Sequence, residues 1–379
     1  MKIIVSPDSF KGSCSAIEVA NSIEKAILAV DSTAEVVKMP VADGGEGTIE
    51  AITSCVPATI HEVEVCDPMG KKAVASYAVL DDETAVIEMA QASGLPMVPT
   101  DERNPLLATT YGTGQLMKDA LDKGCKKMII GIGGSATNDG GAGVLMALGA
   151  SFKNADGEEL ALGGGALADL SEIDLSNFDA RIYDTEITVA CDVTNPLTGE
   201  NGASYVYGPQ KGATPEMVAE LDAALSHFAR KSADKLSEDY STYPGTGAAG
   251  GLGFALIAYC KAKFAAGIDI VLDVCRFEKE LKDADLVITG EGRIDGQSVQ
   301  GKVLYGIGTR AKKADVPVIA IGGGVRSDSE ALLEYGITAM FSIANGPMTL
   351  DYAMENGCEL ITQIAKNVMR VFVITKSNM

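Results

Sequence analysis

The chain has 379 residues, of which 46% are hydrophobic and 22% are charged, the composition of a globular protein rather than a disordered one. This length exceeds what one ordinary core accommodates, so we expect two domains. The formal net charge of −21 argues against nucleic acid as a partner, because binding to its phosphates requires a basic surface.

Three further features of the sequence limit where the protein is located in the cell and which side chains carry out its chemistry. The apolar start at Met1–Val5 is too short for a secretion signal, and no stretch approaches the roughly 20 apolar residues of a membrane span. The eight cysteines are scattered without a C-x-x-C pair, which favours a reducing compartment over a disulfide framework or a zinc site. We therefore predict a cytoplasmic protein without a membrane partner. Because the chain has only two histidines, we expect its chemistry to use Asp, Glu, Lys and Arg.

The first predicted strand, Ile3–Val5, leads into the loop Asp8-Ser9-Phe10-Lys11-Gly12, and a capping-box sequence from Ser15 to Glu18 then begins a helix. The functional interpretation places Lys11 over a phosphate or a carboxylate, close to the start of that helix. The alternative is an ordinary turn with a solvated lysine.

The second glycine-rich loop, Ala42–Thr48, follows a predicted strand at Val36–Val37 and carries Asp43 and Glu46. Either carboxylate can hold a hydrated Mg²⁺ or a substrate hydroxyl. The alternative is that the two acids cap the helix that follows, and both roles are compatible.

Residues 61–110 are less regular. Three β-type runs, at 63–65, 73–77 and 85–89, are separated by turn signals at 68–70 and 81–82. This spacing predicts an antiparallel ribbon or small sheet at the start of a second domain.

The longest glycine-rich loop covers Gly131–Gly143, after a predicted strand at Met128–Ile130. It is not a P-loop, and the dinucleotide-binding spacing G-x-G-x-x-G fails because residue 136 is alanine, although some dinucleotide-binding sequences carry alanine at that place. Glycines interspersed with hydroxyl, amide and acidic side chains are hard to explain by packing, so the pattern favours a ligand-binding loop.

Another strand end, at Val189–Cys191, precedes Asp192. This carboxylate can accept the proton of an attacking hydroxyl, as the carboxylate of a kinase site does. The alternative is an Asx turn before Pro196. Further along, Thr214-Pro215 predicts the start of a helix with an apolar stripe that includes Leu221, Leu225 and Phe228, a stripe that we expect to be core.

Near the C-terminal end, a predicted strand at 286–289 leads into Gly290–Gly296, where the acid Glu291, the cation Arg293 and the acid Asp295 alternate. A second glycine loop, Gly322–Gly324, follows a predicted strand at 318–321. It can admit a nucleotide or a phosphate, and the alternative is a tight strand-to-helix turn.

The alternation of short strands with helical patterns predicts an α/β fold with parallel sheets. We predict one α/β domain formed by both chain ends, residues 1–60 and 285–379, interrupted by a large inserted domain, residues 61–284. Ligands of such sheets bind outside the carboxyl ends of the strands. Glycine loops with acids and cations at those ends therefore predict a phosphoryl-transfer site.

Taken together, these segments resemble the type 1 family of bacterial glycerate kinases. The matching segments occur in the family's order and run nearly end to end: Ser6–Gly12, Ala42–Thr48, Gly112–Gly114, Gly131–Gly141, Cys191–Leu197 and Thr289–Asp295. The resemblance implies ATP- and Mg²⁺-dependent phosphorylation of D-glycerate, a transfer to an alcohol group in glyoxylate and glycerate metabolism. It favours 2-phosphoglycerate over 3-phosphoglycerate as the product and implies small-molecule substrates. It also implies that the domain formed by both chain ends is Rossmann-like with a parallel sheet, that the inserted domain is α/β, and that the active site lies between the two domains. The oligomeric state, monomer or homodimer, stays open.

On this basis the candidate residues receive roles. Asp192 is the first candidate for the general base and Asp295 the second, with Lys11 and Arg293 as the catalytic cations. The candidates for substrate or phosphate binding are Asp8, Ser9, Lys11, Gly133, Gly134, Ser135, Thr137, Asn138, Asp139, Gly290, Gly292 and Gly323. The candidates for the metal are Asp43, Glu46 and Glu291.

Two other functions are compatible with glycine loops. An NAD(P)-dependent oxidoreductase acting on a hydroxy acid predicts tight binding of NAD(P)H and no metal requirement. A non-catalytic sensor would bind glycerate or a nucleotide without turnover, but a passive anion pocket gains nothing from acids gathered at strand ends.

Overall fold

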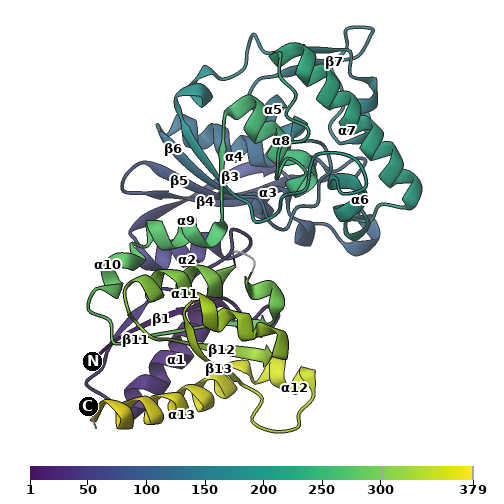
Figure 1. Ribbon diagram of the computed structural model, residues 1–379. Coiled ribbons are helices and arrows are strands. Elements are labelled where there is room, and N and C mark those ends of the chain that lie inside the picture. The colour runs from purple at the N-terminus through teal and green to yellow at the C-terminus, as the bar shows by residue number, and fades with distance from the viewer. Residues whose placement is uncertain (300–301, 378–379) are drawn as a thin grey trace. The chain divides into compact units, whose positions relative to one another are not determined.

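The computed structural model describes residues 1–299 and 302–377. The chain divides into two compact units (Figure 1). The first contains Met1–Asp43, Glu50–Pro57 and Ala266–Met379, and the second contains Gly44–Ile49 and Ala58–Ala265. Both units combine parallel strands with helices, as the predicted α/β fold class requires.

The first unit is built on a five-stranded, wholly parallel sheet with the order β13-β12-β11-β1-β2. From β1 the chain proceeds to β2 on one side, whereas β11, β12 and β13 follow one another on the other side. The strand order therefore reverses between β1 and β11, and in open α/β sheets ligands bind at such a reversal, outside the carboxyl ends of the strands. The strands are β1 (Lys2–Pro7), β2 (Glu35–Lys38), β11 (Leu286–Ile294), β12 (Val318–Val325) and β13 (Ile337–Ser342).

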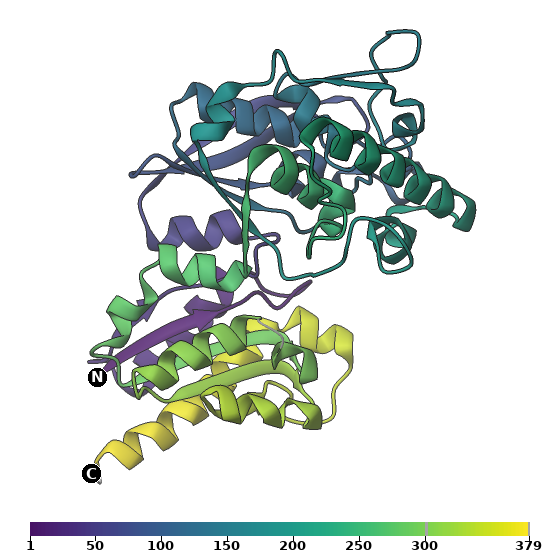
Figure 2. The ribbon, with the colours of Figure 1, turned by 45° about the horizontal axis from the view of Figure 1, so that its top comes forward.

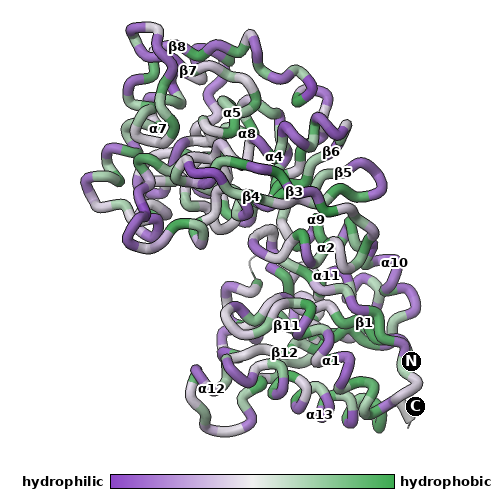
Figure 3. Tube along the Cα trace, turned by 180° about the vertical axis from the view of Figure 1, so that it is seen from behind, coloured by the Kyte–Doolittle hydropathy of each residue, from purple (hydrophilic) through white to green (hydrophobic). Residues whose placement is uncertain are grey.

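Helices cover both faces of this sheet (Figures 1 and 2). On one face α1 (Ala16–Val30) packs against α13 (Gly357–Ser377), and on the other α11 (Val303–Lys313) contacts β11 and β12. Burial on both faces explains the apolar run Ile3–Val5 of β1, and the strand is mainly green in Figure 3. The predicted capping box of α1 is confirmed, because Ser15 and Glu18 exchange hydrogen bonds.

The first unit resumes at Ala266, earlier than the boundary at 285 that the sequence indicates. The reason is that α9 (Gly267–Val274) packs against α11, where Ile268 lies against Gly306. The remaining elements of this unit are α2 (Thr48–Cys55), which begins in the second unit, α10 (Phe277–Leu281), α12 (Leu350–Glu355) and the short 3₁₀ segments η6 (Gly296–Val299) and η7 (Ser327–Tyr335).

The second unit contains a six-stranded sheet with the order β10-β9-β6-β5-β4-β3. The first four strands are parallel, and β3, β4 and β5 form the antiparallel ribbon predicted for this region. The strands are β3 (Ala58–Cys66), β4 (Lys72–Leu80), β5 (Thr84–Glu88), β6 (Lys127–Gly131), β9 (Glu186–Ala190) and β10 (Lys263–Ala265), and a separate hairpin pairs β7 (Ser151–Lys153) with β8 (Glu172–Asp174).

The core of the second unit includes the predicted apolar stripe of α7. Thr214 caps this helix, and the buried Phe228 ring contacts the rings of Phe152 and Phe254. The other helices are α3 (Ala90–Ser93), α4 (Tyr111–Asp122), α5 (Ala142–Ala147), α6 (Ala203–Tyr207), α7 (Pro215–Leu236) and α8 (Ala248–Cys260), with 3₁₀ segments η1 (Leu95–Met97), η2 (Thr100–Glu102), η3 (Gly165–Asp169), η4 (Ala180–Asp184) and η5 (Pro209–Lys211). Within the described residues, none of the helices combines the length and the apolar character needed to cross a membrane.

Candidate active site

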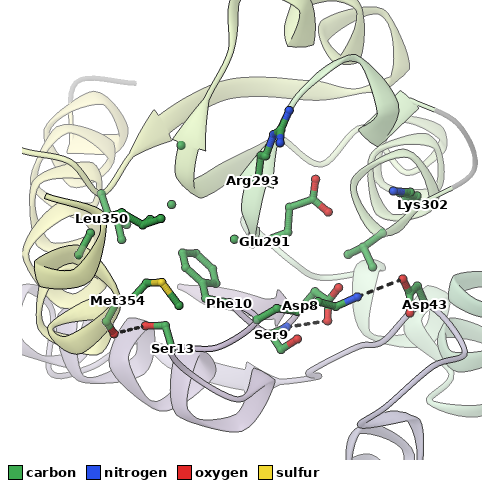
Figure 4. Close-up of a pocket in the computed structure, with 17 residues that line it drawn as sticks. Asp8, Ser9, Phe10, Ser13, Asp43, Glu291, Arg293, Lys302, Leu350 and Met354 are labelled. Atoms are coloured by element: carbon green, nitrogen blue, oxygen red, sulfur yellow. Dashed lines mark hydrogen bonds and ion pairs between the residues drawn. The ribbon is translucent and has the colours of Figure 1, made fainter. Parts of the chain in front are cut away.

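A cavity of about 520 Å³ lies in the first unit at the carboxyl ends of β1, β11 and β12. This is the place where the strand order reverses and where a ligand is expected. Figure 4 shows charged side chains on one part of its wall and apolar ones on another. The lining residues are Asp8, Ser9, Phe10, Lys11, Ser13, Asp43, Glu291, Gly292, Arg293, Lys302, Val303, Gly323, Gly324, Ile343, Leu350, Ala353 and Met354.

The loop after β1 supplies the first charged groups. The backbone N–H of Asp8 donates to Gly290 O at 2.8 Å, which fixes the start of the loop to β11. The carboxylate of Asp8 accepts a hydrogen bond from Ser9 N at 2.6 Å. Lys11 is 77% exposed, and its Nζ lies 3.9 Å from Asp43 Oδ2. An exposed ammonium this loosely paired is available to an anionic ligand.

Burial raises the pKa of Asp8 to about 7, and the nearby charge of Asp43 adds to the effect. Burial also raises the pKa of Glu291, although a hydrogen bond from the Ser298 hydroxyl and the charge of Lys302 oppose the rise. Carboxylates that resist ionisation are stabilised in their charged form when a cation binds beside them.

This acidic group fits a hydrated Mg²⁺ better than a dehydrated metal. No cluster of three metal-ligating side chains occurs in residues 1–299 and 302–377. Mg²⁺ commonly keeps several waters and binds through one or two carboxylates together with substrate phosphates. Asp8, Asp43 and Glu291 line the same cavity and provide that kind of donor set.

Replacing Asp8 with Asn is expected to stabilise the metal-free protein at pH 8 by about 1–3 kcal/mol, because the ionised form of this buried carboxyl is disfavoured in the folded state. The folded-state pKa of about 7 exceeds the ordinary value of 3.8, so the stability contributed by protonation is present at low pH and is lost as the pH rises through about 7. The advantage of Asp8→Asn should therefore shrink as the pH falls from 8 towards 5.5. Thermal melts in EDTA at the two pH values measure it, and an equal or opposite difference at both would contradict the account.

Arg293 reaches the cavity from β11. Its Nε lies 2.8 Å from Asp295 Oδ2, and Asp295 in turn accepts a hydrogen bond from Gln297 N at 2.9 Å. The guanidinium is 64% exposed, whereas Asp295 is 12% exposed. Asp295 therefore positions Arg293 for a ligand. Because Asp295 is engaged in this ion pair, it is poorly suited to act as a general base.

The glycines of β11 and β12 lie in strands, not in the loops that the sequence predicts. β11 continues to Ile294 and β12 to Val325, and the two strands stay paired to their ends. A Cβ on Gly323 would lie 2.3 Å from Gly292 O, so glycine is required for the close approach of these strand ends. Gly292 and Gly323 line the cavity, whereas Gly290 packs against Ile321 and does not.

The apolar wall comes from Phe10 and from a distant part of the chain, Ile343 and residues of α12. Ser13 Oγ donates to Met354 O at 2.6 Å and so connects α12 to the loop after β1. Leu350 is 73% exposed at the cavity. Sequence reasoning missed this wall, because ordinary apolar residues far along the chain carry no motif that would indicate it.

In the second unit, two predicted segments lie at one edge of the sheet. Gly131 at the end of β6 pairs with Ala190 at the end of β9, so the loop after Gly131 and the exposed Asp192 follow neighbouring strands. The loop that carries Glu46 packs nearby, since a Cβ on Gly133 would lie 2.8 Å from Gly45 Cα. Glu46 is exposed and does not line the cavity of the first unit.

The loop after β6 has a buried part and an accessible part. Asp139 is fully buried, and its carboxylate accepts hydrogen bonds from Thr110 N at 2.8 Å, Gly141 N at 3.1 Å and Gly143 N at 3.2 Å. Burial raises the pKa of this carboxyl, and these hydrogen bonds oppose the rise. Asp139 thus holds the loop in shape, while Gly133 and Gly134 lie at its accessible end.

The structure places the predicted residues in two groups. The cavity of the first unit brings together Asp8, Ser9, Lys11, Asp43, Glu291, Gly292, Arg293 and Gly323. The second unit holds Glu46, Gly133, Gly134, Ser135, Thr137, Asn138, Asp139 and Asp192. No sequence motif indicated Lys211, a buried lysine whose Nζ donates to Ser135 Oγ and to Thr137 O.

Comparison with known proteins identifies the relatives of this chain. The sequence pattern of the glycerate kinase family matches residues 3–373. The chain is 49% identical over 378 residues to a glycerate kinase of Bacillus subtilis, covering 100% of this chain and 99% of the relative. It is 47% identical over 379 residues to a glycerate 2-kinase of Escherichia coli, covering both chains completely. The crystal structure of a glycerate kinase from Salmonella typhimurium LT2 matches with a TM-score of 0.89 and 47% identity, covering 100% of this chain and 99% of that one.

Proposed function

The chain belongs to the glycerate kinase family of phosphotransferases, and we propose that it transfers the γ-phosphoryl group of ATP to D-glycerate in a Mg²⁺-dependent reaction of glyoxylate and glycerate metabolism. We further propose 2-phosphoglycerate as the product, because the similar protein of Escherichia coli is named a glycerate 2-kinase. The observation that carries the proposal is the cavity between the ends of β1 and β11, where acids and cations converge.

In this proposal the cations of the cavity bind the phosphates of ATP. Lys11, Arg293 and Lys302 all line it, and the ion pair to Asp295 orients Arg293. Asp8, Asp43 and Glu291 would hold the hydrated Mg²⁺, which supplies charge neutralisation at the phosphate oxygens when it is bound. Phosphoryl transfer requires mainly positioning and charge stabilisation, which these fixed groups can provide.

The apolar wall gives the base of the nucleotide a place to bind, since ligand pockets combine apolar surfaces with a few polar groups. Leu350→Asn should raise the KM for ATP by about 5- to 20-fold, the effect of losing roughly 1–2 kcal/mol of apolar burial. Because Leu350 is exposed, the substitution should leave the melting temperature nearly unchanged. Leu333→Asn, at another exposed leucine outside the cavity, is the matched control. An unchanged KM for ATP in Leu350→Asn would show that the base of the nucleotide does not bind at this wall.

D-Glycerate has a carboxylate to be bound and a hydroxyl to be activated. We propose that the accessible end of the loop after β6, at Gly133 and Gly134, receives the substrate, and that Asp192 accepts the proton of the attacking hydroxyl. Asp192 follows the neighbouring strand β9 and is exposed, which suits a group that must meet a substrate. Asp295, the other candidate base, already pairs with Arg293.

The test is ADP release by the purified protein with ATP and Mg²⁺, with and without D-glycerate. The proposal requires release that depends on D-glycerate and stops when EDTA removes the metal. Related hydroxy acids serve as comparison substrates. Tight NAD(P)H binding without ADP release would instead support the oxidoreductase, and glycerate binding without any turnover would support the sensor.

A further inference from the structure

Lys211 is a buried lysine that the proposed mechanism does not yet use. It ends η5, in the segment between α6 and α7, and is 2% exposed. Its Nζ donates to Ser135 Oγ at 2.7 Å and to Thr137 O at 2.7 Å. A charged amine is costly to bury without an opposite charge or a ligand that compensates for it.

No carboxylate within the described residues forms an ion pair with Lys211. Burial lowers the pKa of its amine to about 7, and the charge of Asp139 partly opposes this effect. The carboxylate of Asp139, however, is engaged by the backbone N–H groups of Thr110, Gly141 and Gly143. An anion bound close to Lys211 would therefore supply the compensation that the protein lacks.

The groups around Lys211 are arranged to receive such an anion. Ser135 Oγ accepts the hydrogen bond from Lys211, so its own hydrogen is free to be donated outward. Gly134 is exposed and has a φ of 74°, and neither Gly133 N nor Gly134 N donates to a protein group in the described part of the chain. Adjacent backbone N–H groups in a turn of this kind form concavities that bind anions.

Two further buried groups in the same loop lack partners. Among the described residues, Thr137 Oγ1 and Asn138 Oδ1 are buried without a hydrogen bond. Buried polar atoms are nearly always paired, so unpaired atoms in a native structure require an explanation. A loop that tightens when a ligand binds would account for both, since it can bring these atoms within reach of new donors.

We propose that the turn Gly133–Ser135 binds an oxyanion of a substrate, and that Lys211 is the positioning residue behind it, which orients the Ser135 hydroxyl and provides positive charge. The inference rests on the proposed kinase function for the identity of the substrates. The proposed placement of D-glycerate at this loop favours its carboxylate as the oxyanion. A phosphate of ATP shares the same chemistry, and experiment separates the two.

The test compares Lys211→Met with Lys231→Met. The first substitution removes the buried ammonium but keeps an unbranched side chain that is only one atom shorter. The second removes a lysine of α7 whose Nζ donates to Ser171 O. Calorimetry of the whole protein with D-glycerate and with ATP gives the two dissociation constants. We expect Lys211→Met to weaken one of them at least tenfold and Lys231→Met to change neither by more than twofold.

The dissociation constants of the two ligands show which of them supplies the oxyanion. A loss for D-glycerate alone assigns the site to the carboxylate, and a loss for ATP alone assigns it to a phosphate. In the wild type the affected affinity should fall as the pH rises above about 7, because the amine of Lys211 then loses its proton, and Lys211→Met should show a smaller fall over that range. A purely structural role would not produce this difference in pH dependence.

Affinities within twofold of the wild type in a folded Lys211→Met protein would overturn the proposal, as would an equal loss in Lys231→Met. If Lys211→Met does not fold, Ser135→Ala replaces it, because it removes the hydroxyl that Lys211 orients. Ser135→Ala must then weaken one ligand, and unchanged binding of both would overturn the proposal as well. If the wild type binds these ligands without phosphorylating D-glycerate, the proposed function fails while the binding comparison still tests Lys211.

Discussion

Asp192→Asn is expected to lower kcat by about 10²- to 10⁴-fold, the range for loss of a general base. Asparagine has nearly the same size and exposure as aspartate but cannot accept the proton of the attacking hydroxyl. The KM for ATP should stay within about twofold, because the proposed nucleotide cavity is lined by other residues. Steady-state kinetics with each substrate varied in turn measure both constants.

Two further variants distinguish the loss of the general base from the effect of losing any negative charge. Asp184→Asn changes another exposed aspartate of the second unit and should leave kcat unaltered. Asp295→Asn should act by releasing Arg293, whose Nε is 2.8 Å away, and therefore should impair phosphate binding as well as turnover. Near-normal kcat in a folded Asp192→Asn protein would remove Asp192 from the role of base.

Arg293→Met should lower kcat/KM by about 10²- to 10³-fold, the usual cost of removing one preorganised group that stabilises transition-state charge. Arg293 lies near the C-terminal end of β11, and its guanidinium is held by a short ion pair to a buried aspartate, Asp295. It therefore needs little reorganisation when negative charge develops on the transferring phosphoryl group. The methionine substitution retains much of the aliphatic length but removes this charge.

The conservative variant sharpens this prediction. Arg293→Lys keeps the charge but loses the planar, two-pronged geometry, so its kcat/KM should lie between those of the wild type and Arg293→Met. Arg230→Met, at an exposed arginine of α7, is the matched control and should be neutral. A kcat/KM within threefold of the wild type in Arg293→Met would contradict the catalytic role.

Much of the fold was predictable from local sequence patterns. The capping box at Ser15 and the cap at Thr214 both mark helix starts in the structure, and the antiparallel ribbon after residue 58 follows from its spaced turn signals. These features are local, because their hydrogen bonds join residues close in the sequence. The extension of β11 to Ile294 was not predictable in this way, since it depends on pairing with β12, roughly 30 residues away.

The candidate site was predictable in part for the same reason. Charged residues beside glycine, such as Asp8, Lys11 and Arg293, stand out in the sequence, and the cavity gathers them. The apolar wall with Leu350 and the buried Lys211 were missed, because their importance comes only from neighbours that are distant in the chain. Lys211 lies 76 residues from Ser135 along the chain, and its surroundings in the sequence resemble an ordinary surface turn.

A phosphorus NMR time course of the purified protein with ATP, Mg²⁺ and D-glycerate tests the proposed phosphoryl transfer directly. We expect ADP and a new phosphomonoester to appear together and only when D-glycerate is present. The phosphorus signal should be a doublet, because in 2-phosphoglycerate one proton lies on the carbon that bears the phosphate. A triplet would contradict the proposed position of transfer. The absence of any phosphomonoester from a folded protein would contradict the kinase itself.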